Sequence, residues 1–139
     1  MKVQIAECVI LDDYGNILLL HRSLSGISRW ELPSGEVAEY EMAEEALMRT
    51  LNDELGCAVR ITKALGNGEI EDYEDDFEYI WFQAVAVDAD PTLNQTDLYD
   101  DLAYFETEDL QSLALAPGMQ LLFDKIMSGE VVLGTPDVV

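Results

Sequence analysis

The stretch that decides the fold runs from Gly35 to Cys57 and reads GEVAEYEMAEEALMRTLNDELGC. Apolar residues recur at helical spacing in its second half, at Ala43, Ala46, Leu47, Leu51 and Leu55. Gly56 follows the last of them, where a glycine commonly caps a helix C-terminus. The segment therefore predicts one helix, beginning near Met42 and ending before Gly56, after a loop that follows Pro33.

Charged residues and glycines occur in the same segment at fixed spacing, namely Gly35, Glu41, Arg49, Leu51, Glu54 and Gly56. This spacing resembles the Nudix box, a loop-helix-loop motif with glycine, glutamate, an Arg-Glu pair and a Glu-Glu pair in that order. The flanks are also similar to the family, because His21-Arg22-Ser23 and Trp30-Glu31-Leu32-Pro33 precede the box. The resemblance covers most of the chain and implies the Nudix α/β/α sandwich with a mixed, curved sheet.

Positions 50, 53, 54 and 57 fall at i, i+3, i+4 and i+7, which places them on one face of a helix. Carboxylates on such a face hold hard divalent cations, which neutralise charge and lower the pKa of an attacking water. The resemblance implies that Asp53 and Glu54 are catalytic residues and bind Mg²⁺ or Mn²⁺ together with the carbonyl of Gly35. It implies for Glu41 and Arg49 an ion pair that ties the loop to the helix.

Several positions depart from the family pattern. Thr50 stands where the Arg-Glu pair has its glutamate, and a neutral hydroxyl is a weak ligand and a poor base. Asp53 replaces the first glutamate of the second pair and is shorter by one methylene. Ser34 and Tyr40 stand where glycines are usual. These departures predict a weakened metal site.

The rest of the chain predicts strands and helices in an order that suits an α/β sandwich. The residues 3–11 and 17–20 form two apolar runs around a turn, which predicts a β-hairpin. The run 23–28 is a small polar loop. The segments expected to form further strands are 30–33, 57–65, 77–87 and 102–105, with an acidic turn at 71–76. A short helix from Thr107 to Leu113 and a final helix from Pro117 to Gly129 complete a single domain over residues 1–139.

The composition limits the partners. The 139 residues carry 29 Asp and Glu against 7 Lys and Arg, for a formal charge of -22. This field repels nucleic acid polymers and anionic membranes, whereas a small nucleotide can bind where a cation or a local arginine cancels it. Without a long apolar segment the chain is expected to be cytoplasmic, with Cys8 and Cys57 as buried free thiols. Family resemblance also makes a homodimer one candidate assembly.

Three further positions leave alternatives open. Arg22 either meets a substrate phosphate or forms an ion pair at the edge of a strand. His21, the single histidine, has no evident partner and favours a packed or surface imidazole. Glu106 or Glu108, in a late loop, is a candidate for the base that Thr50 cannot supply. Substrate choice is expected to lie in the loops 23–29 and 88–99.

The favoured hypothesis is therefore metal-dependent hydrolysis of a nucleoside diphosphate derivative by a Nudix-type pyrophosphohydrolase, weakened by Thr50. The first alternative is a catalytically impaired protein that keeps the fold and binds a nucleotide. The second is a structural or interaction domain whose acidic helix face is merely solvated.

Overall fold

The computed structural model describes residues 2–71, 74–94 and 97–135. Within these ranges, seven strands and three helical segments follow each other. The strands are β1 (Lys2–Ile10), β2 (Ile17–Leu24), β3 (Ile27–Glu31), β4 (Ser34–Glu36), β5 (Val59–Glu71), β6 (Asp76–Ala86) and β7 (Tyr99–Phe105). The helical segments are α1 (Ala43–Leu55), the 3-10 helix η1 (Thr107–Ser112) and α2 (Pro117–Met127).

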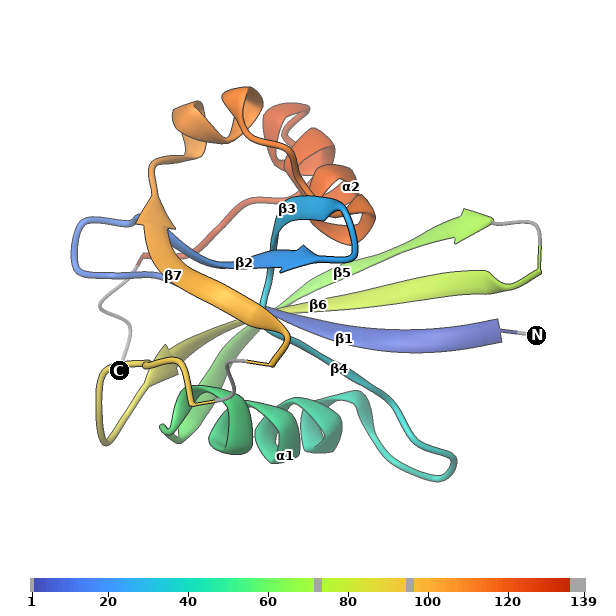
Figure 1. Ribbon diagram of the computed structural model, residues 1–139, viewed down its shortest axis with the longest axis horizontal. Helices are drawn as coiled ribbons and strands as arrows, with labels where there is room; N and C mark the ends of the chain where they lie inside the picture. Colours follow the sequence, from blue (N-terminus) through green and yellow to red (C-terminus); the bar gives the residue numbers. More distant parts are fainter. Residues whose placement is uncertain (1, 72–73, 95–96, 136–139) are drawn as a thin grey trace.

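The strands form two sheets that lie between two helical layers (Figure 1). One sheet has the order β4-β1-β6-β5 and is mixed, because β1 and β6 are parallel while the other neighbours are antiparallel. The second sheet is antiparallel and has the order β3-β2-β7. Helix α1 covers one side of this β structure, and η1 and α2 cover the other (Figure 1).

Helix α1 ends where the sequence predicts. Gly56 adopts the left-handed conformation at φ 64°, which glycine tolerates without the Cβ penalty of other residues. At the other end, the Glu45 carboxylate accepts a hydrogen bond from the Met42 N–H at 3.3 Å. The face of α1 that packs on the β structure is fully buried and consists of Ala46, Leu47, Leu51 and Leu55.

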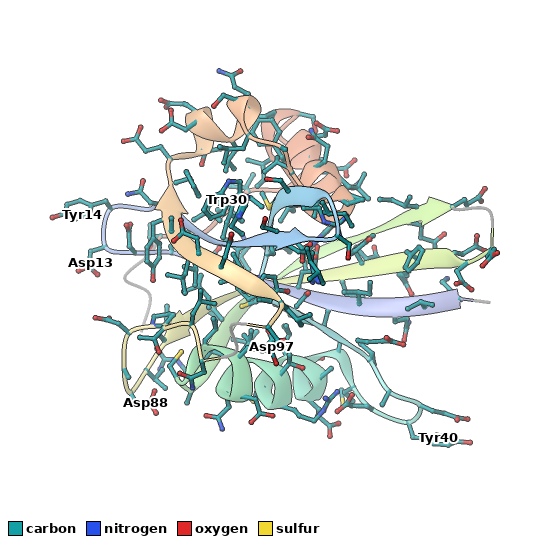
Figure 2. All side chains as sticks on the ribbon, in the orientation of Figure 1. Asp13, Tyr14, Trp30, Tyr40, Asp88 and Asp97 are labelled. Atoms are coloured by element: carbon teal, nitrogen blue, oxygen red, sulfur yellow. The ribbon has the colours of Figure 1, made fainter. Side chains whose placement is uncertain are left out.

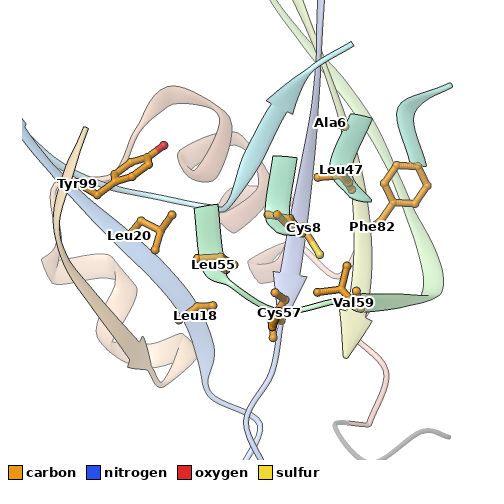
Figure 3. Close-up of a cluster of buried hydrophobic side chains, with 13 residues drawn as sticks. Ala6, Cys8, Leu18, Leu20, Leu47, Leu55, Cys57, Val59, Phe82 and Tyr99 are labelled. Carbon is orange, nitrogen blue, oxygen red and sulfur yellow. The ribbon is translucent and has the colours of Figure 1, made fainter. Parts of the chain in front are cut away.

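Two apolar cores fill the spaces on either side of the β structure. The core under α1 includes Leu47, Leu55, Cys8 and Phe82 (Figure 3). Both cysteines are free and buried there, as the sequence predicts. The core under α2 is built around Trp81, with the apolar side of α2 packed against it. Each helix is therefore held mainly by its apolar face.

The predicted hairpin between the first two apolar runs is wrong. Strand β1 pairs with β4 and β6, and its only pairing toward β2 is an isolated bridge between Leu11 and Ile17. The turn does form, with Asp12 accepting hydrogen bonds from the Tyr14 and Asn16 backbone. A turn determines only where the chain reverses, and here the two strands continue into different sheets.

Two other local predictions need correction. The expected polar loop 23–28 is mostly strand, because β2 and β3 pair as far as Leu24 and Ile27 around a two-residue turn. The strand expected to end at residue 65 continues through Gly66–Gly68 to Glu71 as β5, after register shifts between Ile61 and Lys63 and between Ala64 and Gly66. The acidic stretch 71–76 lies partly outside the described residues. Within the described ranges, no helix is long and apolar enough to cross a membrane.

Truncation of Leu51 to alanine tests the α1 core. Leu51 is fully buried, so the variant is expected to lose roughly 2–5 kcal/mol of unfolding free energy, measured by urea denaturation. Met48 lies on the same helix but is 48% exposed, so Met48→Ala should change stability by less than about 0.5 kcal/mol. Equal losses in the two variants would contradict this packing.

Candidate active site

The loop before α1 is fastened to the helix by an ion pair. Arg49 donates to both carboxylate oxygens of Glu41, at 3.0 and 2.9 Å, and to the Glu36 carbonyl at 3.3 Å. Glu41 also accepts a hydrogen bond from the Ala38 N–H at 3.0 Å. These contacts join the loop to α1 within the protein itself, so the role they show for Glu41 and Arg49 is structural.

The tip of that loop carries Tyr40, whose side chain is 98% exposed and points into solvent (Figure 2). Its backbone has φ 66°, the left-handed region that residues with a Cβ adopt at a cost of about 1–2 kcal/mol. The conformation explains why a glycine would suit this position. The tyrosine keeps the loop shape despite that cost.

Thr50 uses its hydroxyl within the helix. The Oγ1 atom donates to the carbonyl of Ala46 at 2.7 Å, one turn earlier. Strand β4 approaches this point so closely that a Cβ added to Gly35 would collide with Thr50 Oγ1 and lie 3.1 Å from the Ala46 carbonyl oxygen. The residue in the usual glutamate position therefore packs β4 against α1 and extends no carboxylate.

Glu54, near the end of α1, has one carboxylate oxygen without a partner in the described part of the chain. Its Oε2 atom is buried and accepts no hydrogen bond from the described residues. Burial raises the pKa of Glu54 to about 7; the charge of Arg22 opposes this shift, while Glu31 and Asp53 add to it. Asp53, the neighbouring acid, is exposed. An orphaned buried carboxylate oxygen beside a second acid fits a bound cation.

The described residues contain no group of three His, Cys, Asp or Glu side chains gathered as metal ligands. This agrees with the box having Thr50 in place of one acid. The donors that remain near the end of α1 are the carboxylates of Asp53 and Glu54. Gly35, buried where β4 meets α1, contributes only backbone.

Facing Glu54 lies a cluster that the sequence did not reveal, built around the buried carboxylate of Glu31. Arg22 donates to Glu31 from Nε at 2.7 Å and from a terminal nitrogen at 3.1 Å, and Arg29 donates from Nε at 2.7 Å. Tyr99 donates to Glu31 at 3.4 Å. Although burial favours protonation, the two guanidinium groups hold the pKa of Glu31 below its usual range.

Both alternatives considered for Arg22 are compatible with this geometry. Arg22 forms the expected ion pair, yet it also lines a cavity of about 170 Å³. The cavity is lined by Ile5, Glu7, Arg22, Arg29, Glu31, Ser34, Tyr79, Ala116, Pro117 and Gly118. Backbone hydrogen bonds between Trp30 and residues 114 and 116 place the start of α2 at its rim.

Other predicted residues lie elsewhere. His21 has partners, contrary to the prediction, since Nδ1 lies 2.7 Å from Asp100 Oδ1 and Nε2 lies 3.1 Å from Ser28 Oγ. Glu106 and Glu108 follow the end of β7 that pairs with Ile17, whereas Tyr99 and Arg22 pair at the opposite end. This placement does not bring them toward Glu54.

Glu7 and Arg29 are cavity residues that sequence reasoning missed. A signal for Glu7 existed, because it is a charged residue within the apolar run of β1 and so had to be either paired or functional. Arg29 was missed because residues 23–28 were expected to form a loop; in β3, Arg29 and Glu31 are two residues apart and so project from the same face of the strand.

Comparison with known proteins gives consistent results. The family model described as "NUDIX domain" matches residues 1–126. The nucleoside triphosphatase NudI of Klebsiella pneumoniae is 27% identical over 129 residues, covering 83% of this chain and 90% of that protein. The 8-oxo-dGTP diphosphatase of Proteus vulgaris is 37% identical over 60 residues, which is 42% of this chain and 54% of that protein.

Among solved structures, a MutT protein from Methanosarcina mazei Go1 superposes with a TM-score of 0.79 at 22% identity. The match covers 93% of this chain and 95% of that chain. The α/β fold expected from the box is thereby confirmed as the Nudix fold, with its β structure divided into the two sheets described above.

The raised pKa of Glu54 has a consequence for stability. Because the folded state holds this proton up to about pH 7 while an unfolded glutamate loses it near 4.5, the contribution of Glu54 to stability falls as pH rises through this interval. We expect Glu54→Gln to reduce that fall, measured in metal-free buffer by urea denaturation from pH 4.5 to 8. Asp53→Asn controls for removal of one charge. An unchanged pH profile in Glu54→Gln would contradict the assignment.

Proposed function

This chain belongs to the NUDIX domain family, and we propose that it is a metal-dependent hydrolase of a nucleoside diphosphate derivative, a small nucleotide-type substrate. The observation that carries the proposal is the buried oxygen of Glu54 that has no hydrogen-bond partner among the described residues, on a side chain close enough to Arg22 to be affected by its charge. A carboxylate buried without a partner is costly, and a divalent cation would relieve that cost. The names of the relatives, a nucleoside triphosphatase and an 8-oxo-dGTP diphosphatase, are consistent with such a substrate.

The roles follow from the placement of the residues. Asp53 and Glu54 would hold Mg²⁺ or Mn²⁺, with the carbonyl of Gly35 as a third ligand. The ion supplies charge neutralisation and a more acidic water when bound. Arg22 and Arg29 neutralise the phosphates, because Glu31 occupies only part of each guanidinium group and leaves further N–H donors for a ligand. Glu41 and Arg49 keep the loop in register with the helix.

The cavity beside the arginines is the place for the rest of the nucleotide. It adjoins the positive groups and is bounded by Tyr79 and the start of α2, so a nucleoside attached to the phosphates would enter it. In a chain with a formal charge of -22, two converging guanidinium groups are a local exception that favours an anionic ligand.

A second candidate function is nucleotide binding with little turnover. Thr50 favours it, because its hydroxyl is already bonded to Ala46 and the site has one carboxylate fewer than the family pattern. With either function, we propose that the chain forms a single domain over residues 1–139, is cytoplasmic and assembles as a homodimer.

Release of nucleoside monophosphate or phosphate from a panel of nucleoside diphosphate derivatives tests the activity. We expect release that requires Mg²⁺ or Mn²⁺ and falls by about 100-fold or more in Glu54→Gln, because that variant loses a charged ligand. Turnover that persists in Glu54→Gln would remove Glu54 from the mechanism. No turnover with any substrate would favour the binding role.

Thr50→Glu tests whether the missing carboxylate at position 50 limits the rate of hydrolysis. Restoring a carboxylate is expected to raise metal-dependent hydrolysis by about tenfold or more. Thr50→Gln is the matched control, since it adds the same length without the charge. If Thr50→Glu hydrolyses no faster than the native chain while remaining folded, position 50 does not limit catalysis.

A further inference from the structure

Glu7 is a buried acid that the proposed mechanism does not use. It lies in β1, whose neighbours on either side are β4 and β6, and is only 5% exposed. Its Oε1 atom accepts a hydrogen bond from the indole Nε1 of Trp81 at 2.9 Å. This contact fixes one oxygen of the carboxyl group and the orientation of the other.

The second oxygen is available to a ligand. Among the described residues, none donates a hydrogen bond to Glu7 Oε2, and Glu7 lines the 170 Å³ cavity. Buried polar groups are almost always hydrogen-bonded, so a polar group inside the cavity would complete the pairing of Glu7.

The protein keeps space for such a group. Gly118, in the first turn of α2, lies against Glu7, and an added Cβ would stand 2.6 Å from Glu7 Oε1 and 2.6 Å from Tyr79 Cε1. Any side chain at position 118 would therefore push into the carboxyl group and the aromatic ring. Glycine here lets the helix approach while the cavity stays open.

The surroundings of Glu7 determine which hydrogen bond it can offer. No described cation pairs with it, and burial, with a smaller effect of the Glu31 charge, raises its pKa to about 8 against the opposing hydrogen bond from Trp81. A neutral carboxyl group whose Oε1 accepts from Trp81 carries its proton on Oε2. Glu7 then donates one hydrogen bond into the cavity.

The cavity lining combines two kinds of polar group. Arg22 and Arg29, held by Glu31, supply positive charge, and Glu7 supplies a neutral donor near Gly118. A nucleotide whose phosphates meet the arginines would bring its base toward Glu7. A keto oxygen on that base would accept from Oε2, whereas an amino group would set a donor against a donor.

We propose that Glu7 is a specificity-determining residue that donates to a keto oxygen of the bound nucleobase. The substrate class is therefore nucleotides of 6-oxopurines or 4-oxopyrimidines, in preference to their 6-amino and 4-amino counterparts. The proposal rests on the proposed function in taking the ligand to be a nucleotide, but not on its hydrolysis.

Calorimetric binding of monophosphates tests this without turnover. The probes are inosine and adenosine monophosphate, which differ at the 6-position with the linked change at N1, and uridine and cytidine monophosphate, which differ at the 4-position with the linked change at N3. We expect the native chain to bind the keto member of each pair about tenfold more tightly, because a mismatched buried donor is left unpaired. The measurements are made in Mg²⁺ buffer at neutral pH.

Two variants separate the hydrogen bond from the shape of the pocket. Glu7→Gln keeps an acceptor for Trp81 and a donor for the ligand, so it should keep the keto preference. Glu7→Leu removes both, so the ratio within each pair should fall toward one. Circular dichroism and thermal unfolding show whether each variant is folded; if Glu7→Leu does not fold, the native chain and Glu7→Gln still decide the matter.

For the native chain, the proposal is overturned by equal binding of both members of a pair, by a preference for the amino member, or by no binding of any probe. For the variants, it is overturned by loss of the keto preference in Glu7→Gln or by an unchanged ratio in folded Glu7→Leu. Failure of the hydrolase proposal has a different signature. In that case the metal-dependent assay shows no turnover while the keto preference in binding persists.

Discussion

The buried Glu31 carboxylate is the interaction on which the site depends. Alone it would carry a large desolvation cost, and Arg22 and Arg29 offset that cost through three hydrogen bonds of 2.7 to 3.1 Å. Because Arg22 lies in β2 and Tyr99 in β7, the same carboxylate joins all three strands of the smaller sheet. The cluster concentrates two of the four arginines of a strongly acidic chain in one place.

Helix α1 packs against the core with one face and carries the proposed metal ligands outside that face. Leu47, Leu51 and Leu55 hold it on the core, and this fixes where Asp53 and Glu54 emerge near its end. The close approach of β4 at Gly35 leaves position 50 facing backbone, and threonine fills it with a hydrogen bond to its own helix. The packing of β4 on α1 therefore does not need an acid at position 50, so the fold is retained although the family pattern has a glutamate there.

Local sequence patterns predicted where the helices and strands lie better than which strands pair with each other. The spacing of apolar residues, the C-terminal cap at Gly56 and the proline that begins α2 determine α1 and α2, because helix hydrogen bonds and capping involve residues close in sequence. The hairpin prediction failed because strand pairing is decided by contacts distant in sequence. Strand β1 pairs in parallel with β6, more than seventy residues later, whereas β2 belongs to the other sheet.

For the site, the sequence by itself determined the box, with the order of Gly35, Glu41, Arg49 and Glu54 and the missing acid at position 50. It also determined an acidic field that a cation or a local arginine must cancel before a phosphate ligand can bind. Only the tertiary structure decided that Glu31 holds two arginines, that Glu54 keeps an unpartnered oxygen, and that Glu7 faces a cavity. The physical reason is that burial and charge pairing depend on which segments meet in space. The spacing of residues along a helix shows which of them share a face, but it does not show which residues from other segments lie against that face.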